Sequence, residues 1–184
     1  DWPSCSGLST GTVAGSGRKA QLAKARRSIS HFNHKRRKEV EEKLILLVED
    51  NPDEEALELR ALNHNGIDSE VVVARDGAEA LDFLFGTGVY AGRDTNIMPT
   101  VTFLDLRLPK VDGLEVLQRM RADDRTKLLP VVTLSSSDEE HDIITSYESK
   151  VNSYVRKPVS FTAFTEAVRQ LGMYWMQLNE PPRV

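Results

Sequence analysis

From residue 43 onward, short apolar runs alternate with longer stretches of helical periodicity, and this alternation restricts the fold more than any other feature. The apolar runs predict strands near residues 44–48, 70–74, 101–104, 130–134 and 152–155. The stretches that follow them predict helices near residues 53–65, 77–86, 113–122, 138–149 and 160–178. Five successive strand–helix units favour a doubly wound α/β fold, in which a five-stranded parallel sheet carries helices on both faces.

The predicted helices begin at residues that commonly cap helix N-termini. Asn51 precedes Pro52, and proline suits the first turn of a helix. Capping side chains stand at the starts of the later helices: Asp76, Asp112, Ser137 or Asp138, and Ser160. Residues 86–99 form a longer connection with three glycines, which predicts an exposed loop.

Residues 1–42 differ in composition from the rest of the chain. They carry nine Lys and Arg against four Asp and Glu, whereas residues 43–184 carry 15 against 24. Residues 1–17 are rich in Gly, Ser and Thr and predict a flexible segment. The basic cluster Lys35-Arg36-Arg37-Lys38 could neutralise nucleic-acid phosphates. We interpret residues 1–42 as a flexible basic segment, with nucleic-acid binding as an alternative.

Composition also limits the cellular setting. Cys5 is the single cysteine, so the chain forms no intrachain disulfide and nothing indicates an oxidising compartment. No apolar run approaches the ~20 residues of a membrane span. We therefore expect a cytoplasmic protein, with one domain over residues 43–180 and a short tail over 181–184.

Charged residues follow three of the predicted strands where each strand ends. Glu49 and Asp50 follow the first strand, Asp105 follows the third, and Lys157 lies just past the fifth. Neighbouring parallel strands end at one edge of a sheet, and open α/β sheets bind ligands at that edge. We therefore expect three acids and one lysine to meet there.

This set of residues suits phosphoryl transfer to an aspartate. An aspartate can accept a phosphoryl group and form an acyl phosphate. The reaction needs a divalent cation, and Mg²⁺ prefers oxygen ligands such as carboxylates. It also needs a cation that pairs with the phosphoryl oxygens, which lysine supplies as a point charge. The acids predict a Mg²⁺ site, with Asp105 as the candidate phosphoryl acceptor.

Residues 43–180 resemble the receiver domains of two-component response regulators, whose sheet has the strand order 2-1-3-4-5. The resemblance implies that Asp105 is the phosphoacceptor and that Lys157 assists it. It also implies that Glu49, Asp50, Asp105 and the backbone carbonyl of Arg107 hold Mg²⁺. The proline after the lysine, here Pro158, usually follows a cis bond in this family.

The same resemblance implies a conformational switch. Ser135 ends the fourth strand and would donate a hydrogen bond to a phosphoryl oxygen, which draws its loop inward. Tyr154 would then turn into the space that the loop vacates. Such an element is bistable, and a new charge on Asp105 biases it.

The last predicted helix carries an apolar stripe that exceeds what a sheet can cover. Phe161, Phe164, Val168, Leu171, Trp175 and Leu178 recur at alternating spacings of three and four. Large apolar groups left exposed in such number indicate an interface. We expect a homodimer through Val168, Leu171, Tyr174, Trp175 and Leu178.

The C-terminal segment Gln170–Pro182, the long loop before the third strand and the acceptor segment Leu104–Pro109 are similar to those of response regulators paired with bacterial phytochromes. That similarity implies a phytochrome-type sensor histidine kinase as the phosphodonor. No further stretch suits an output domain, so we expect signalling through a changed surface. The downstream target and the lifetime of the phosphorylated state are not predictable from the sequence.

A metal-dependent phosphatase with an aspartyl nucleophile is the alternative enzymatic interpretation. Such enzymes usually carry a second aspartate two residues after the nucleophile, and Arg107 occupies that position here. We therefore favour a phosphoacceptor without catalysis beyond its own phosphorylation and dephosphorylation.

Overall fold

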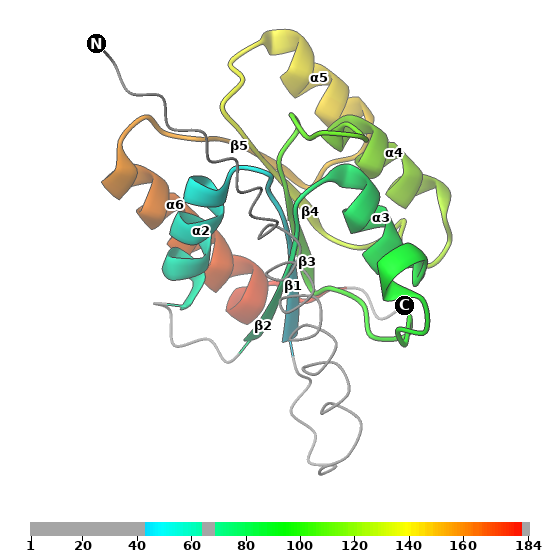
Figure 1. Cartoon of the computed structure of the whole chain (residues 1–184). Helices are drawn as coiled ribbons and strands as arrows, with labels where there is room; N and C mark the ends of the chain where they lie inside the picture. The colour runs from blue at the N-terminus through cyan, green and yellow to red at the C-terminus, as the bar shows by residue number, and fades with distance from the viewer. Residues whose placement is uncertain (1–42, 64–68, 182–184) are drawn as a thin grey trace, which may run out of the picture. The chain divides into compact units, whose positions relative to one another are not determined.

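The computed structural model describes residues 43–63 and 69–181 (Figure 1). The predicted basic segment 1–42, with its candidate nucleic-acid-binding cluster, lies outside the described residues, as does most of the 181–184 tail. No helix in the described ranges is long and apolar enough to cross a membrane.

A five-stranded parallel sheet forms the centre of the fold. Its strands are β1 Lys43–Val48, β2 Ser69–Ala74, β3 Val101–Leu104, β4 Val131–Ser135 and β5 Ser153–Arg156. Their order is β2-β1-β3-β4-β5, with every neighbouring pair parallel, which confirms the predicted fold and strand order. Val48 pairs with both Ala74 and Leu104, so β1, β2 and β3 end at the same level.

Helices cover both faces of this sheet. They are α2 Pro52–Asn63, α3 Gly77–Phe85, α4 Gly113–Ala122, α5 Glu140–Glu148 and α6 Phe161–Met173. Figure 1 shows α2 and α6 on one face and α3, α4 and α5 on the other. Alternate residues of β1 serve the two layers, since Leu46 packs with α3 and α4 while Leu47 packs with α2 and α6. Because both faces of β1 are buried, its sequence is a nearly continuous run of apolar residues.

Four of the predicted helix caps are confirmed and one is wrong. Asn51 accepts a hydrogen bond from the Asp53 amide at 3.0 Å at the start of α2. Asp76 accepts a hydrogen bond from the Glu79 amide at 2.8 Å. Asp112 and Ser160 cap α4 and α6 in the same way. The fourth helix instead begins at Glu140 after Glu139. The predicted cap residues lie in the preceding loop, where Ser137 accepts from the Glu139 amide and Asp138 pairs with Arg156.

The connection between α3 and β3 is a loop that carries one short 3-10 helix, Gly88–Tyr90. Arg93 from this loop lies over the Phe83 ring at 3.9 Å, so a cation–π contact holds the loop against α3. The predicted loop is therefore present, and Arg93 in its middle packs against α3.

The last helix changes its geometry where a continuous helix to residue 178 was predicted. α6 ends at Met173, and one π-helical turn follows from Tyr174 to Leu178. Val168 and Trp175 are buried in the core cluster beneath α2 and α6, and Leu171 packs against it. Tyr174 and Leu178 remain exposed by 49% and 74%. Of the five predicted dimer residues, Val168 and Trp175 are thus covered within the protomer, which reduces the predicted surface to the other three.

Candidate functional site

Backbone hydrogen bonds extend the sheet by one residue beyond several strand ends and place the candidate site residues side by side. The amide of Asp105 donates to the carbonyl of Val48 at 3.0 Å, and the amide of Lys157 donates to the carbonyl of Ser135 at 2.8 Å. Their side chains therefore start from fixed backbone positions at one edge of the sheet.

Lys157 is the centre of the site. Its ammonium group donates hydrogen bonds to Glu49 at 2.6 Å, to Glu54 at 2.5 Å and to Asp105 at 2.8 Å. Burial by itself lowers the pKa of Lys157, but the charges of Asp105 and Glu49 exceed that effect and the pKa is raised. Lys157 therefore carries its charge at every physiological pH.

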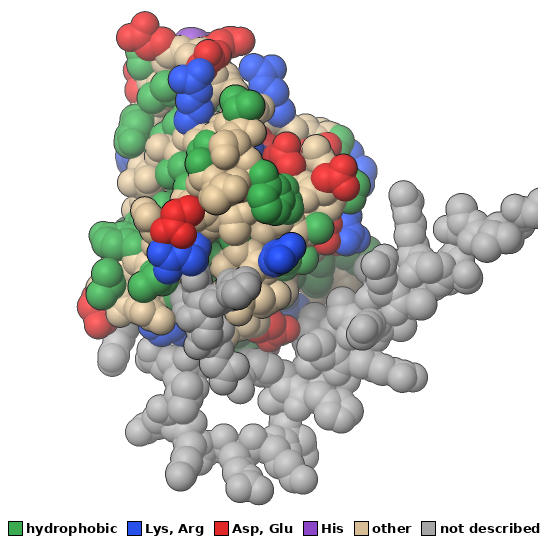
Figure 2. All heavy atoms as spheres, turned by 90° about the vertical axis from the view of Figure 1, so that its left-hand side faces the viewer, with side chains coloured by type: hydrophobic (Ala, Val, Ile, Leu, Met, Phe, Trp, Pro, Cys, Tyr) green, Lys and Arg blue, Asp and Glu red, His purple; other side chains and the backbone are tan. Residues whose placement is uncertain are grey.

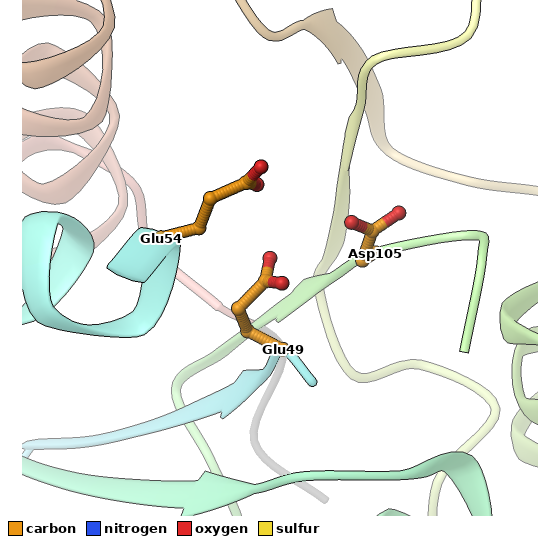
Figure 3. A group of neighbouring side chains, drawn as sticks. All are labelled: Glu49, Glu54 and Asp105. Carbon is orange, nitrogen blue, oxygen red and sulfur yellow. The ribbon is translucent and has the colours of Figure 1, made fainter. Parts of the chain in front are cut away.

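Glu49, Glu54 and Asp105 form a cluster that could hold a metal ion. One carboxylate oxygen from each lies within 4.8 Å of the other two. Figure 3 shows the three side chains, from β1's end, the first turn of α2 and β3's end, directed toward a common space. Three carboxylates suit a hard divalent cation, which takes oxygen ligands. The ammonium of Lys157 lies among them as a cationic stand-in.

Glu49 is the most enclosed member of this cluster. Only 1% of its surface is exposed, and burial raises its pKa, while the nearby Lys157 opposes that rise. The Asn51 amide donates to its Oε1 at 3.0 Å, which fixes the carboxylate.

Two predicted metal ligands, Asp50 and the carbonyl of Arg107, stay predictions. Asp50 is exposed, and its carboxylate does not belong to the clustered group of the described residues. The amide of Arg107 donates to Asp105 Oδ1 at 3.0 Å, whereas the role of its carbonyl stays a prediction. The Arg107 side chain turns toward the start of α5 and pairs with Glu139 at 3.5 Å and Asp142 at 3.6 Å.

Glu54 was missed by sequence reasoning. It lies in an acidic first turn of α2, with Asp53 and Glu55 beside it, and such acids normally complement the helix dipole. Because Lys157 lies 103 positions away, only the tertiary structure, which brings Glu54 within reach of the lysine that follows β5, reveals the contact. Its place in the first turn of the helix that directly follows Glu49 and Asp50 was the signal that the sequence offered.

Ser135 and Tyr154 both contact the loop between β4 and α5. Ser135 is fully buried, and its Oγ accepts a hydrogen bond from the Ser137 amide at 3.1 Å. The hydroxyl of Tyr154 donates to the Ser137 carbonyl at 3.2 Å. The two predicted switch residues thus meet at one loop, and their switching role stays a prediction.

Gly113 allows the β3–α4 loop to close beneath the site. A Cβ at this position would lie 2.1 Å from the Asp105 carbonyl oxygen. The glycine amide instead donates to the Leu106 carbonyl at 2.9 Å. The start of α4 therefore holds the Asp105 backbone from below.

The peptide bond before Pro158 is trans, because the described residues contain no cis peptide bond. The cis bond that the resemblance implied at this position is therefore absent.

A doubly wound sheet of this order, with an aspartate, a glutamate and a lysine at its carboxyl edge, defines a receiver domain. The family model for the response regulator receiver domain matches residues 45–169. The chain belongs to this family and is a receiver-domain response regulator.

Its relatives include regulators associated with phytochromes. The response regulator Rcp1 of Synechocystis is 37% identical over 135 residues, which are 73% of this chain and 90% of Rcp1. The structure of Mn²⁺-bound Rcp1 matches with a TM-score of 0.72 at 36% identity, covering 76% of this chain and 99% of Rcp1.

Two further structures place the chain beside phytochrome regulators. The phosphorylated cyanobacterial phytochrome response regulator RcpA matches with a TM-score of 0.71 at 38% identity, covering 76% of this chain and 98% of RcpA. The bacteriophytochrome response regulator AtBRR is 53% identical with a TM-score of 0.60, covering 75% of this chain and 98% of AtBRR.

Proposed function

We propose that this response regulator accepts a phosphoryl group on Asp105 from a sensor histidine kinase. The observation that carries the proposal is the contact of Asp105 with Lys157 at 2.8 Å, beside the clustered carboxylates of Glu49 and Glu54. Asp105 also accepts a hydrogen bond from the Arg107 amide, which orients its carboxylate. The group is 12% exposed at its side chain, so an incoming donor can reach it.

The phosphoryl transfer from a phosphohistidine to Asp105 forms one bond and breaks one bond, and it consumes no third reactant. An Asp105 oxygen forms a bond to phosphorus, the phosphorus–nitrogen bond of a phosphohistidine breaks, and its electron pair stays on the imidazole nitrogen. Lys157 offers its ammonium to the negative phosphoryl oxygens. The product is an acyl phosphate on Asp105, which water can later hydrolyse, and the protein needs no further catalysis of its own.

The proposed cofactor is Mg²⁺. Glu49, Asp50, Asp105 and the carbonyl of Arg107 would hold it, while Glu54 beside them would remain an acceptor for Lys157. The clustered oxygens support this assignment, because they match the ligand preference of the ion. When bound, a divalent cation offsets the negative charge that accumulates between carboxylate and phosphoryl oxygens.

The proposed donor is a phytochrome-type histidine kinase in the cytoplasm. The support is the likeness to regulators named for phytochromes, two of which share 50% and 53% of their residues with this chain. Light would then control the phosphorylation of Asp105 through that kinase.

We further propose that the phosphorylated state is signalled through Ser135 and Tyr154. Both already hydrogen-bond Ser137. Ser135 Oγ can keep the hydrogen bond that it accepts from the Ser137 amide while its O–H donates to a phosphoryl oxygen. Movement of Ser135 toward the phosphoryl group would therefore draw the Ser137 amide with it and shift the loop that Tyr154 touches. A charge on Asp105 would thereby reach the surface of α5 and β5.

A homodimer through the C-terminal turn is part of this proposal. Tyr174 and Leu178 are large apolar side chains that stay exposed, with Leu171 beside them half-buried. On the side of the molecule that α2 and α6 cover, exposed hydrophobic side chains lie among acidic and basic ones (Figure 2). Pairing two copies would remove the apolar surface of this turn from water.

Acyl-phosphate labelling tests the central claim. The chain is incubated with acetyl phosphate and Mg²⁺, and the added phosphoryl group is followed by intact-mass spectrometry. We expect the parent to be labelled and Asp105→Asn to remain unlabelled, because an amide cannot accept the group. Asp112→Asn is the matched control, since asparagine still caps α4, and it should be labelled like the parent. Equal labelling of Asp105→Asn would refute the assignment.

A further inference from the structure

Glu58 is a buried carboxylate that the proposed phosphotransfer leaves without a task. It lies on α2, one turn after Glu54, and has no exposed surface. Among the described residues, neither of its carboxylate oxygens has a hydrogen-bond partner, and its ion pair is to Lys157 Nζ at 3.9 Å. Burying an unbonded carboxyl group is costly, so its position calls for a partner in another state of the protein.

The number of donors on Lys157 explains why Glu58 is unbonded. An ammonium group has three N–H donors. All three are used, on Glu49, Glu54 and Asp105. Glu58 is therefore the fourth acceptor around three donors, and it is left at 3.9 Å.

Binding of a divalent cation changes this count. Glu49 and Asp105 belong to the carboxylate cluster that suits the cation. Once their oxygens turn to a metal, two N–H groups of Lys157 lose their acceptors. A movement of about 1 Å would bring Lys157 within hydrogen-bond distance of Glu58.

We propose that Glu58 is a positioning residue, the acceptor that holds Lys157 when Glu49 and Asp105 bind a divalent cation. This inference rests on the proposed function, because it requires the metal site. Lys157 would then keep Glu54 and Glu58 as acceptors on α2 and direct its third N–H toward the phosphoryl group on Asp105.

Electrostatics supports this exchange. Burial raises the pKa of Glu58 to about 8, and the charges of Glu49, Glu54 and Asp105 add to the rise, whereas Lys157 opposes it. A neutral carboxyl group still accepts an N–H donor through its carbonyl oxygen. The bond strengthens as the ammonium approaches, since charge-assisted hydrogen bonds are about twice as strong as neutral ones.

The test measures Mg²⁺ affinity of the whole chain by isothermal titration calorimetry. Glu58→Met removes the acceptor at similar volume, and Glu58→Gln keeps an acceptor without the charge. We expect Glu58→Met to bind Mg²⁺ roughly 5-fold more weakly, about 1 kcal/mol, because Lys157 then stays on Glu49 and Asp105. Glu58→Gln should recover part of the affinity. Glu55→Met is the control on the same helix, as Glu55 pairs with Arg75 instead.

A double-mutant cycle with Lys157→Met separates positioning from direct charge effects. If Glu58 acts through Lys157, Glu58→Met changes Mg²⁺ affinity less than about 2-fold in the Lys157→Met background. An effect of Glu58→Met that persists without Lys157, or parent-like affinity of Glu58→Met alone, overturns the inference. If the inference is overturned in this way but the parent still binds Mg²⁺ and is labelled on Asp105, the proposed function is unaffected. A parent chain that binds no Mg²⁺ overturns both the inference and the Mg²⁺ dependence.

Discussion

Lys157 is a buried ammonium surrounded by more acid than it can neutralise. Three carboxylates bond to it, and a fourth, that of Glu58, lies nearby without a hydrogen bond. The pKa of Lys157 is raised, whereas those of the enclosed acids Glu49 and Glu58 are also raised, chiefly by their burial. Burial therefore favours the protonated forms of Glu49 and Glu58, whereas it does not discharge Lys157.

Glu58 gives this imbalance a pH dependence that can be measured. Its pKa rises from 4.5 to about 8 on folding, so the folded state retains a proton that the unfolded state loses. Stability from this proton is complete below pH 4.5 and is lost as pH rises through 8. Glu58→Gln has no titrating group at this position, so its stability does not fall in this way. The free energy of unfolding of Glu58→Gln relative to the parent should therefore rise by about 2–4 kcal/mol between pH 5 and pH 8.

Urea unfolding in EDTA at several pH values checks this prediction. The groups that face Glu58 are Lys157, Glu49, Glu54 and Asp105, and both chains share them. Glu55→Gln is the control, because its carboxylate pairs with Arg75. A difference between Glu58→Gln and the parent that stays constant from pH 5 to pH 8 would contradict the buried, proton-retaining carboxyl group.

At the scale of elements, the start of α4 fixes the position of the loop that follows Asp105. Its first residue, Gly113, touches the Asp105 carbonyl so closely that a Cβ would lie 2.1 Å away. Gly113→Ala should therefore destabilise the fold by about 1–3 kcal/mol and slow the labelling of Asp105, because the loop must move. Chemical denaturation and labelling rates measure both effects. Gly92 lies on the α3–β3 loop with open space around it but with a φ of +90°, so Gly92→Ala should cost some stability and leave labelling unchanged. Parent-like labelling of Gly113→Ala would argue against the close packing.

The C-terminal turn separates core residues from candidate interface residues. Trp175 is 8% exposed, whereas Leu178 is 74% exposed only three positions later. Trp175→Ala should cost about 3–5 kcal/mol of stability. The double variant Tyr174→Ser, Leu178→Ser should instead keep the parent's stability and shift a dimer toward monomer. Light scattering after gel filtration at micromolar concentration checks this, and a double variant as dimeric as the parent would place the dimer contact elsewhere.

Local pattern predicted the elements well and their tertiary contacts less well. The five strands lie within one residue of their predicted bounds. The inner strands β1, β3 and β4 are buried almost throughout, so they lack polar alternation, whereas the edge strands β2 and β5 are only partly buried. In the sequence, Glu54 and Glu58 resemble ordinary acids of a solvated helix, and only the fold brings them near Lys157. Ser137 looks like a helix cap, but it is buried in the loop that Tyr154 contacts. The π-helical turn after Met173 also depends on packing, since Trp175 and Met176 both enter the core.

At the scale of the whole molecule, Lys157 connects four elements that are distant in sequence. Its bonds reach the ends of β1 and β3 and the first turn of α2, while its own backbone continues β5. Removing the ammonium leaves the clustered carboxylates to repel one another. The stability of the sheet edge is thus coupled to whichever cation lies in this space.

Lys157→Met tests that coupling. In EDTA we expect it to be less stable than the parent by about 3 kcal/mol, because buried acids lose their partner. Mg²⁺ should then restore more stability to this variant than to the parent, since the ion no longer competes with an ammonium for Glu49 and Asp105. A ligand that binds the folded state stabilises it by about 2.7 kcal/mol at 100 times its Kd. A tighter site in the variant therefore gives a larger rise in Tm at the same Mg²⁺ concentration.

Thermal unfolding with and without Mg²⁺ measures this difference. Lys127→Met is the control, because Lys127 is an exposed lysine paired with Asp124. A Mg²⁺-induced rise no larger in Lys157→Met than in the parent would show that lysine and metal do not share these carboxylates.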